Sequence, residues 1–146
     1  MKIQETIQQV AARLDSADLC YGHGTDNPLD EAFYLIYGLL DIDFADEQAA
    51  QRELNVGEEV MLEAAVKRRI DERVPTAYLV RRAWFAGHEF YCDERALVPR
   101  SPLAELINGE FEPLLHEPAG KVLDICTGGG SIGIATALLW PDCEVD

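Results

Sequence analysis

The feature that most constrains this chain is a glycine-rich turn that lies between a short apolar run and an apolar helical stretch. Residues 121–126 are typical of a short buried strand, and residues 131–140 are typical of a helix. Between and just inside these segments, Gly128, Gly130 and Gly133 follow the spacing G-x-G-x-x-G. A strand, a glycine turn and a helix in this order predict the first unit of a doubly wound α/β sheet.

The glycine turn is predicted to bind a small charged ligand. Glycine allows a left-handed backbone and a close approach of the ligand, and the free N–H groups that open a helix attract an anion. Asp124 precedes Gly128 by four residues, where its carboxylate would repel a pyrophosphate and attract a cation. S-adenosylmethionine carries a sulfonium, an ammonium and a carboxylate but no phosphate, so it suits this turn better than a dinucleotide does. A tight turn without any ligand is the alternative.

A second carboxylate, which would bind the ribose of the ligand, is expected about twenty residues beyond the turn. A second strand is predicted to begin at Cys143, and Asp146 lies close to the expected distance. We do not assign the ribose carboxylate to Asp146, because the second strand has barely begun there.

The first eighty residues show helical periodicity. An amphipathic helix is predicted over residues 3–19, followed by an apolar helix from Pro28 onward that suits the centre of a small bundle, a short helix around 47–54 and a long helix over about 58–73. Asp26 or Asn27 is expected to cap the second of these helices, and Asn55 the fourth. The apolar side of the fourth helix is expected to consist of Val60, Ala64, Val66 and Ile70. An ion pair between Glu63 and Lys67, four residues apart, is expected to support the same helix.

The pattern changes after Leu79. Residues 83–92 are rich in aromatic side chains around a central glycine, which predicts a β-hairpin with these side chains in its core rather than in a binding wall. A third strand is predicted at 96–98, and a further helix is predicted to start at Pro102.

The charge balance bears on the partners of the protein. The formal net charge is −15, from 27 acidic and 12 basic side chains. Nucleic-acid binding depends on basic contacts to phosphates, so direct DNA binding is not expected. The balance favours a cationic protein as a partner, although solubility alone is the other interpretation.

The cysteines and the apolar runs restrict the class of protein further. The wide, irregular spacing of Cys20, Cys92, Cys126 and Cys143 indicates neither a metal site nor a disulfide scaffold. No apolar run approaches the roughly 20 residues that span a bilayer, and no signal-peptide block is seen. We therefore expect a cytoplasmic protein that is not associated with a membrane.

Several motifs together resemble a known family. Residues 122–130 resemble motif I of the class I S-adenosylmethionine methyltransferases. Three further segments resemble the HemK-type protein-glutamine methyltransferases, which methylate the side-chain amide of glutamine in translation proteins: 75–79, 85–90 and 97–100. Segments 21–28 and 100–107 resemble the branch that modifies large-subunit ribosomal protein three, which is basic. The release-factor branch instead has Pro-Glu-Thr-Glu after the arginine.

The resemblance implies an α/β fold with three parts. These are a mainly helical substrate-binding domain over 1–80, a β-hairpin linker over 81–100, and over 101–146 the truncated first part of a Rossmann-like class I methyltransferase domain. The implied contacts to S-adenosylmethionine are Asp124, Cys126, Thr127, Gly128, Gly129 and Gly130. Cys126 stands where glycine is commoner in the family, which leaves slightly less room for the ligand.

Two further residues are candidates for substrate or pocket contacts. His23 lies in a glycine-rich loop, where packing of the turn is the alternative role. Arg100 lies at a strand-to-helix corner, where a surface ion pair with Glu105 is the alternative. The family's Asn-Pro-Pro-Tyr motif, which holds the glutamine amide, does not occur in these 146 residues. No catalytic residue is therefore named, and we expect that the chain alone cannot transfer a methyl group.

Three other functions remain open at this point. An adenine-specific DNA methyltransferase shares motif I, but the net charge of −15 counts against it. A nicotinamide-dependent dehydrogenase is disfavoured by Asp124 beside the glycine turn. A non-catalytic module that docks the substrate protein is the third.

Overall fold

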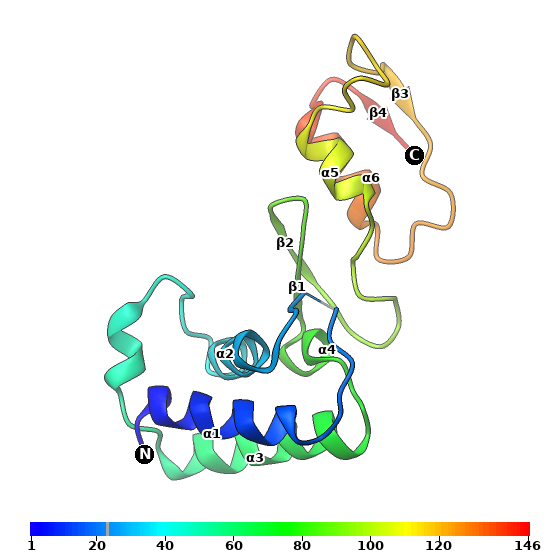
Figure 1. Ribbon diagram of the computed structural model, residues 1–146. Coiled ribbons are helices and arrows are strands. Elements are labelled where there is room, and N and C mark those ends of the chain that lie inside the picture. Colours follow the sequence, from blue (N-terminus) through cyan, green and yellow to red (C-terminus); the bar gives the residue numbers. More distant parts are fainter. Residues whose placement is uncertain (23) are drawn as a thin grey trace. The chain divides into compact units, whose positions relative to one another are not determined.

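The computed structural model describes residues 1–22 and 24–146, and the chain divides into two compact units, Met1–Arg81 and Arg82–Asp146 (Figure 1). The first unit is helical, and the second combines helices with short strands, so the predicted α/β class is confirmed. Within the described part of the chain, no helix is both long enough and apolar enough to cross a membrane.

The first unit is built from α-helices and one turn of 3-10 helix. Its elements are α1 (Ile3–Asp15), α2 (Pro28–Leu39), η1 (Glu47–Gln51), α3 (Val56–Asp71) and α4 (Thr76–Val80). Their apolar sides form one core, to which α1 contributes Ile3, Ile7, Val10 and Leu14, as its periodicity predicts. Helix α1 ends four residues earlier than predicted, and Asp18 in the segment that follows has a left-handed φ of 48°.

The second helix starts where the sequence predicts. Asn27 caps α2, because its side-chain oxygen accepts a hydrogen bond from the backbone N–H of Asp30 at 2.9 Å, and Pro28 occupies the first helical position. Helix α2 then runs through the centre of the unit, where Leu35, Ile36 and the ring of Tyr37 are buried. Burial raises the pKa of the Tyr37 hydroxyl.

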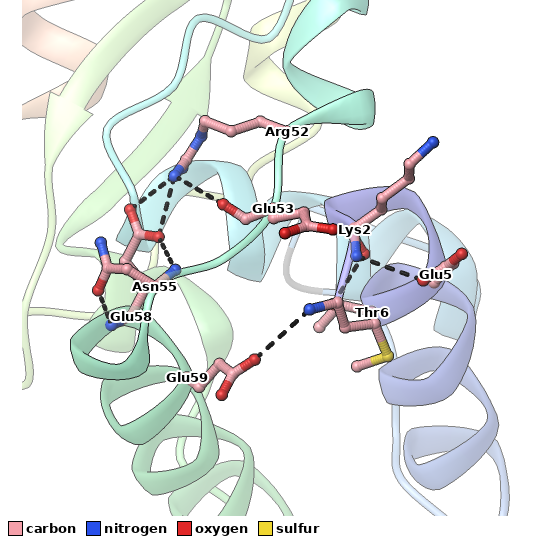
Figure 2. Close-up of polar contacts among 9 residues, drawn as sticks. Lys2, Glu5, Thr6, Arg52, Glu53, Asn55, Glu58 and Glu59 are labelled. Atoms are coloured by element: carbon pink, nitrogen blue, oxygen red, sulfur yellow. Dashed lines mark hydrogen bonds and ion pairs between the residues drawn. The ribbon is translucent and has the colours of Figure 1, made fainter.

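The start of α3 is fixed by a capping box, as Figure 2 shows. The Asn55 side chain accepts a hydrogen bond from the Glu58 backbone N–H at 3.0 Å, and the Glu58 carboxylate accepts one from the Asn55 N–H at 2.9 Å. Arg52 donates to both oxygens of the Glu58 carboxylate at 2.9 Å. The hydrogen bonds from Arg52 and from the Asn55 backbone both lower the pKa of Glu58, and the one from Arg52 has the larger effect.

The predicted apolar side of α3 is wrong in part. Val60 is 66% exposed and Ala64 is also exposed. The stripe that packs inward is instead Leu62, Ala65, Val66 and Arg69. Neighbouring residues on a helix point about 100° apart, so this small change of phase moves the buried face away from Val60 and Ala64. The change of the buried face comes from a contact with another helix, because Arg69 at the end of this face is buried in an ion pair with Glu31 of α2.

The expected Glu63–Lys67 pair on α3 is replaced by a pair between helices. Arg13 of α1 donates to both carboxylate oxygens of Glu63, at 2.7 and 2.8 Å. The hydrogen bond from Arg13 lowers the pKa of Glu63, since it favours the charged carboxylate.

The second unit contains an antiparallel hairpin and a parallel pair of strands. Its elements are β1 (Arg82–Phe85), β2 (His88–Tyr91), α5 (Leu103–Asn108), β3 (Lys121–Val122), α6 (Ser131–Leu139) and β4 (Glu144–Val145). The predicted hairpin is confirmed, with Phe85 opposite His88 in the register. Ala86 and Gly87 form its turn, both with positive φ, which suits the twist of the two strands.

The hairpin has one buried face and one exposed face. Phe85 is buried, and the Phe85 and Phe90 rings meet edge to face at 6.5 Å between centroids. Trp84 and Tyr91 are exposed, so the prediction that all four aromatic side chains form the core holds for only half of them. Successive side chains on a strand point to opposite faces, which makes the exposure of Trp84 a direct consequence of the burial of Phe85.

The strand predicted at residues 96–98 does not form, because residues 93–96 make a turn and the following residues have no regular structure. The strand–turn–helix–strand pattern at residues 121–146 is confirmed as β3, α6 and β4, in which Lys121 pairs with Glu144 in a parallel register. Strand β3 is shorter and less buried than predicted, since Leu123 and Ile125 are 68% and 74% exposed. A parallel strand becomes buried when it has strand neighbours and helices on both faces, and in the described residues β3 pairs with β4 alone.

Candidate functional site

The glycine turn between β3 and α6 has the backbone that its sequence predicts. Gly128 and Gly130 have φ values of 58° and 77°, in the left-handed region that favours glycine. Gly130 is the residue that precedes the first turn of α6. The turn therefore leads directly into a helix N-terminus, where N–H groups point outward without intrahelical partners.

Cys126 also adopts the left-handed conformation, with φ of 66°. A side chain in this region costs a residue about 1–2 kcal/mol, because Cβ approaches the following carbonyl oxygen. The Cys126 side chain is exposed, so packing does not compensate this cost. The backbone at this position is thus one that glycine adopts more easily than cysteine.

The third glycine of the motif allows the helix to lie close to the strands. A Cβ atom on Gly133 would lie 3.2 Å from Oδ2 of Asp124 and 3.5 Å from Cγ1 of Val145. Oδ2 of Asp124 accepts a hydrogen bond from the Gly133 N–H at 3.0 Å. One oxygen of this carboxylate therefore fastens α6 to the end of β3 and closes the glycine turn at its base.

Two hollows of the second unit border the glycine turn. The smaller, of about 230 Å³, is lined by Asp124, Thr127, Gly130, Gly133, Ile134, Ala137, Val145 and Asp146. The larger, of about 460 Å³, is lined by Phe90–Asp93, Arg95, Ala96, Leu97, Pro99, Gly128, Gly129 and Ile134. The larger hollow has the size of a small-molecule site. Ile134 lines both hollows, and each of them also includes residues of the glycine turn.

The part of the larger hollow that Asp93 and Arg95 line was not predicted from the sequence. Asp93 and Arg95 form an ion pair there, with Arg95 Nε 3.0 Å from both carboxylate oxygens. This contact lowers the pKa of Asp93 to about 2. Burial raises the pKa of the neighbouring Cys92 thiol. The only indication of this ion pair in the sequence is the spacing of an acidic and a basic residue two positions apart. This spacing does not identify a site, because it also occurs in ordinary surface turns.

The predicted site residues are brought together only in part. Asp124 and the stretch Cys126–Gly130 lie in one turn, with Asp124 half-buried and Cys126 exposed. Arg100 is exposed and lines neither of the two hollows that border the glycine turn. The ion pair between Arg100 and Glu105 is not among those formed by the described residues. His23 lies outside the described residues.

Asp146 follows β4 and lines the smaller hollow together with Asp124. Its backbone N–H donates to the carbonyl of Val122 at 3.0 Å, and its carbonyl accepts from the N–H of Asp124 at 2.8 Å. The two parallel strands thus carry carboxylates side by side at their ends, which gives this edge a negative character.

Comparisons with known proteins support the resemblance drawn from the motifs. No family model matches the chain. Two curated relatives are both named ribosomal protein uL3 glutamine methyltransferase. The one from Burkholderia pseudomallei is 39% identical and the one from Xanthomonas campestris pv. campestris 45% identical, each over 99% of this chain. The matches cover 48% and 47% of the relatives, so the chain spans about half the length of the curated relatives it matches. The predicted resemblance to the uL3 branch is confirmed.

Proposed function

The chain is related over 99% of its length to ribosomal protein uL3 glutamine methyltransferases, and from this premise we propose that it acts in the same reaction. The reaction moves a methyl group from S-adenosylmethionine to the side-chain amide nitrogen of a glutamine in uL3. The glycine turn of the second unit would hold the cofactor, and the helical first unit would dock the ribosomal protein.

The observation that carries the cofactor proposal is the combination of charges around the glycine turn. The N-terminus of α6 offers a partial positive charge to the carboxylate of the methionine part. Asp124 and Asp146, which line the smaller hollow, offer negative charge to the ammonium and sulfonium. A pyrophosphate would meet the same two carboxylates and be repelled.

The larger hollow suits the remaining, more apolar part of such a ligand. Phe90, Leu97 and Ile134 contribute apolar side chains to its lining, and Gly128 and Gly129 of the glycine turn line it as well. Residues without a Cβ allow the ligand to approach the main chain closely. The predicted contacts at Cys126, Thr127 and Gly129 are part of this proposal.

The bound cofactor would supply an electrophilic methyl group on a sulfonium, and this chain would supply its orientation. A glutamine amide is a poor nucleophile, so alignment of the two reacting atoms accounts for much of the rate. Asp124 serves this alignment by holding α6 against β3 through the Gly133 N–H. The −15 charge of the chain favours the approach of a basic ribosomal protein from solution.

Isothermal titration calorimetry tests the proposal. S-adenosylmethionine and purified uL3 are each titrated into the 146-residue chain, with a DNA duplex as a third ligand. We expect heat of binding from the first two and none from DNA. The variant Gly130→Val, which forces a β-branched side chain into a left-handed position, should lose the cofactor and keep uL3. Binding of DNA in place of uL3 would favour a nucleic-acid methyltransferase instead.

A further inference from the structure

Helix α3 carries a second apolar row on its outer side. Val56, Val60 and Ala64 are spaced four residues apart, which places them one above another on the helix surface. This outer row is exposed throughout, Val56 by 76% and Val60 by 66%. The inner side of α3 packs into the core through Leu62 and Val66, so core packing does not account for the outer row. Single exposed apolar side chains are ordinary, whereas apolar residues gathered on one face often mark a contact with a partner.

A groove of about 340 Å³ adjoins the outer row. Its lining residues come from α1, from α3 and from the segments just before these helices: Met1, Thr6, Gln9, Val10, Arg13, Leu54, Glu59, Leu62 and Glu63. Three of them belong to the hydrophobic core and give the groove an apolar part. Glu59 follows Val56 by three residues, and residues three apart are neighbours on a helix surface. Glu63 and Val60 are neighbours in the same way, so the groove and the outer row lie side by side.

Two carboxylates lie where the groove meets the outer row. The Glu59 and Glu63 side chains are 49% and 63% exposed. Glu63 accepts both hydrogen bonds from Arg13, and a carboxylate oxygen of Glu59 lies 3.7 Å from the amino group of Met1. Exposed ion pairs of this kind contribute little to stability, so a cation from another molecule can replace the one within the chain at small cost. The carboxylates can therefore accept a lysine or an arginine of a partner.

The charge of the first unit indicates which kind of partner this surface fits. In the unit Met1–Arg81, acidic side chains outnumber basic ones by 16 to 8. Such a field attracts a cationic partner and repels a nucleic acid. Lysine and arginine can lay their aliphatic stems on apolar surface while their charged ends reach a carboxylate. An apolar row beside two carboxylates is therefore complementary to a basic protein segment that also carries apolar side chains.

We propose that the outer row of α3 and the groove beside it form the docking surface for a basic segment of uL3. Apolar side chains of that segment would cover Val56 and Val60, and a lysine or arginine would pair with Glu59 and Glu63. This inference rests on the proposed function, in which the first unit docks uL3, and it names the face that makes the contact. Arg13 occupies Glu63 in the free chain and so competes with the partner. Removing the Arg13 guanidinium should therefore strengthen binding.

The outer row is tested with matched variants of the 146-residue chain. The double variant Val56→Gln, Val60→Gln replaces its two largest side chains by polar ones that suit a helix. The control is Leu29→Gln, which makes the same kind of change at an apolar side chain of α2 that is 45% exposed. Because all three side chains are exposed, circular dichroism and Tm should stay as in the unmodified chain.

Calorimetry with purified uL3, at low and at physiological salt, measures the affinity of each variant. The outer-row variant should bind about tenfold more weakly at both salt concentrations, because it loses an apolar contact, and the Leu29→Gln control should bind normally. The double variant Glu59→Gln, Glu63→Gln should bind about threefold more weakly at low salt, with a smaller loss at physiological salt. Arg13→Gln should bind about threefold more tightly, because it leaves Glu63 to the partner.

Three results would overturn the inference. If the outer-row variant binds uL3 as well as the Leu29→Gln control does, this face is not the contact, and the proposed function stands. If sedimentation velocity shows a dimer that the outer-row variant dissociates while its affinity for uL3 is unchanged, the row joins two copies of the chain instead. If the unmodified chain does not bind uL3 at all, the proposed docking fails and the inference fails with it, whereas the proposed binding of S-adenosylmethionine is unaffected.

Discussion

Replacing Cys126 by glycine should stabilise the second unit. Cys126 has a left-handed φ of 66°, which costs a residue with a Cβ about 1–2 kcal/mol. Glycine relieves this cost but loses roughly 0.4–1 kcal/mol through the greater freedom of the unfolded chain. Because the Cys126 side chain is exposed, little packing is lost. The net gain is about 0.5–1 kcal/mol, or roughly 2–8 °C in Tm for a unit of this size.

Tryptophan fluorescence during thermal unfolding measures this gain. Trp84 and Trp140 are the two tryptophans of the chain, and both belong to the second unit, so the signal reports on that unit. Cys126→Ala is the matched control, because it removes the thiol and keeps the Cβ in the left-handed conformation. We expect it to leave Tm nearly unchanged. A Cys126→Gly variant no more stable than Cys126→Ala would refute the reasoning from backbone strain.

Three further predictions concern other parts of the structure. Gly133→Ala should destabilise the second unit by roughly 0.5–2 kcal/mol, because the new Cβ crowds the Asp124 carboxylate that the Gly133 N–H binds, and this outweighs the gain of about 0.5–1 kcal/mol from alanine within α6; unchanged tryptophan-detected unfolding would contradict this. Asn55→Ala should cost about 1 kcal/mol by removing the cap of α3, measured as a lower midpoint in urea followed by circular dichroism. Arg95 holds the pKa of Asp93 at about 2. The pair therefore stabilises the folded state fully at pH values above the ordinary pKa of an aspartate, and this stabilisation is lost as the pH falls toward 2. NMR titration of the Asp93 carboxyl should show this midpoint, and Arg95→Gln should raise it; a midpoint that does not move would show that Arg95 is not its cause.

The parts of the fold that the sequence predicted are those set by local chemistry. Asn27 and Asn55 are caps because their side chains bind backbone N–H groups three residues away. The hairpin turn at Ala86–Gly87 follows from one glycine between two aromatic runs. The βαβ unit was predicted because Gly128 and Gly130 lie between a segment with the pattern of a strand and a segment with the pattern of a helix.

The parts that the sequence did not predict depend on contacts between distant residues. The buried face of α3 includes Arg69, a charged residue that a pattern of apolar residues does not place on a buried face. Arg69 is buried because it pairs with Glu31, which lies 38 residues away in the sequence. Leu123 and Ile125 are exposed, although their apolar side chains predict burial. Their exposure depends on which strands and helices surround β3, and the local sequence does not contain this information.

The same division holds for the candidate site. The conformation of the glycine turn was predicted from residue types, whereas its closure by the Asp124–Gly133 hydrogen bond requires the packing of α6 on β3. The sequence does not predict that Asp93 and Arg95 line the larger hollow, because its pattern favours a strand at residues 96–98, whereas residues 93–96 make a turn. Local spacing thus predicted the glycine turn but not the other residues that line the larger hollow.

The central claim is that the glycine turn accepts a zwitterionic sulfonium ligand and rejects a dinucleotide. Amide chemical shifts of residues 124–134, recorded by NMR while each ligand is added separately, test it most directly. The account predicts that S-adenosylmethionine moves the signals of Gly128, Gly129 and Gly130 in a saturable way and that NAD leaves them in place. Saturable shifts with NAD and none with S-adenosylmethionine would contradict it.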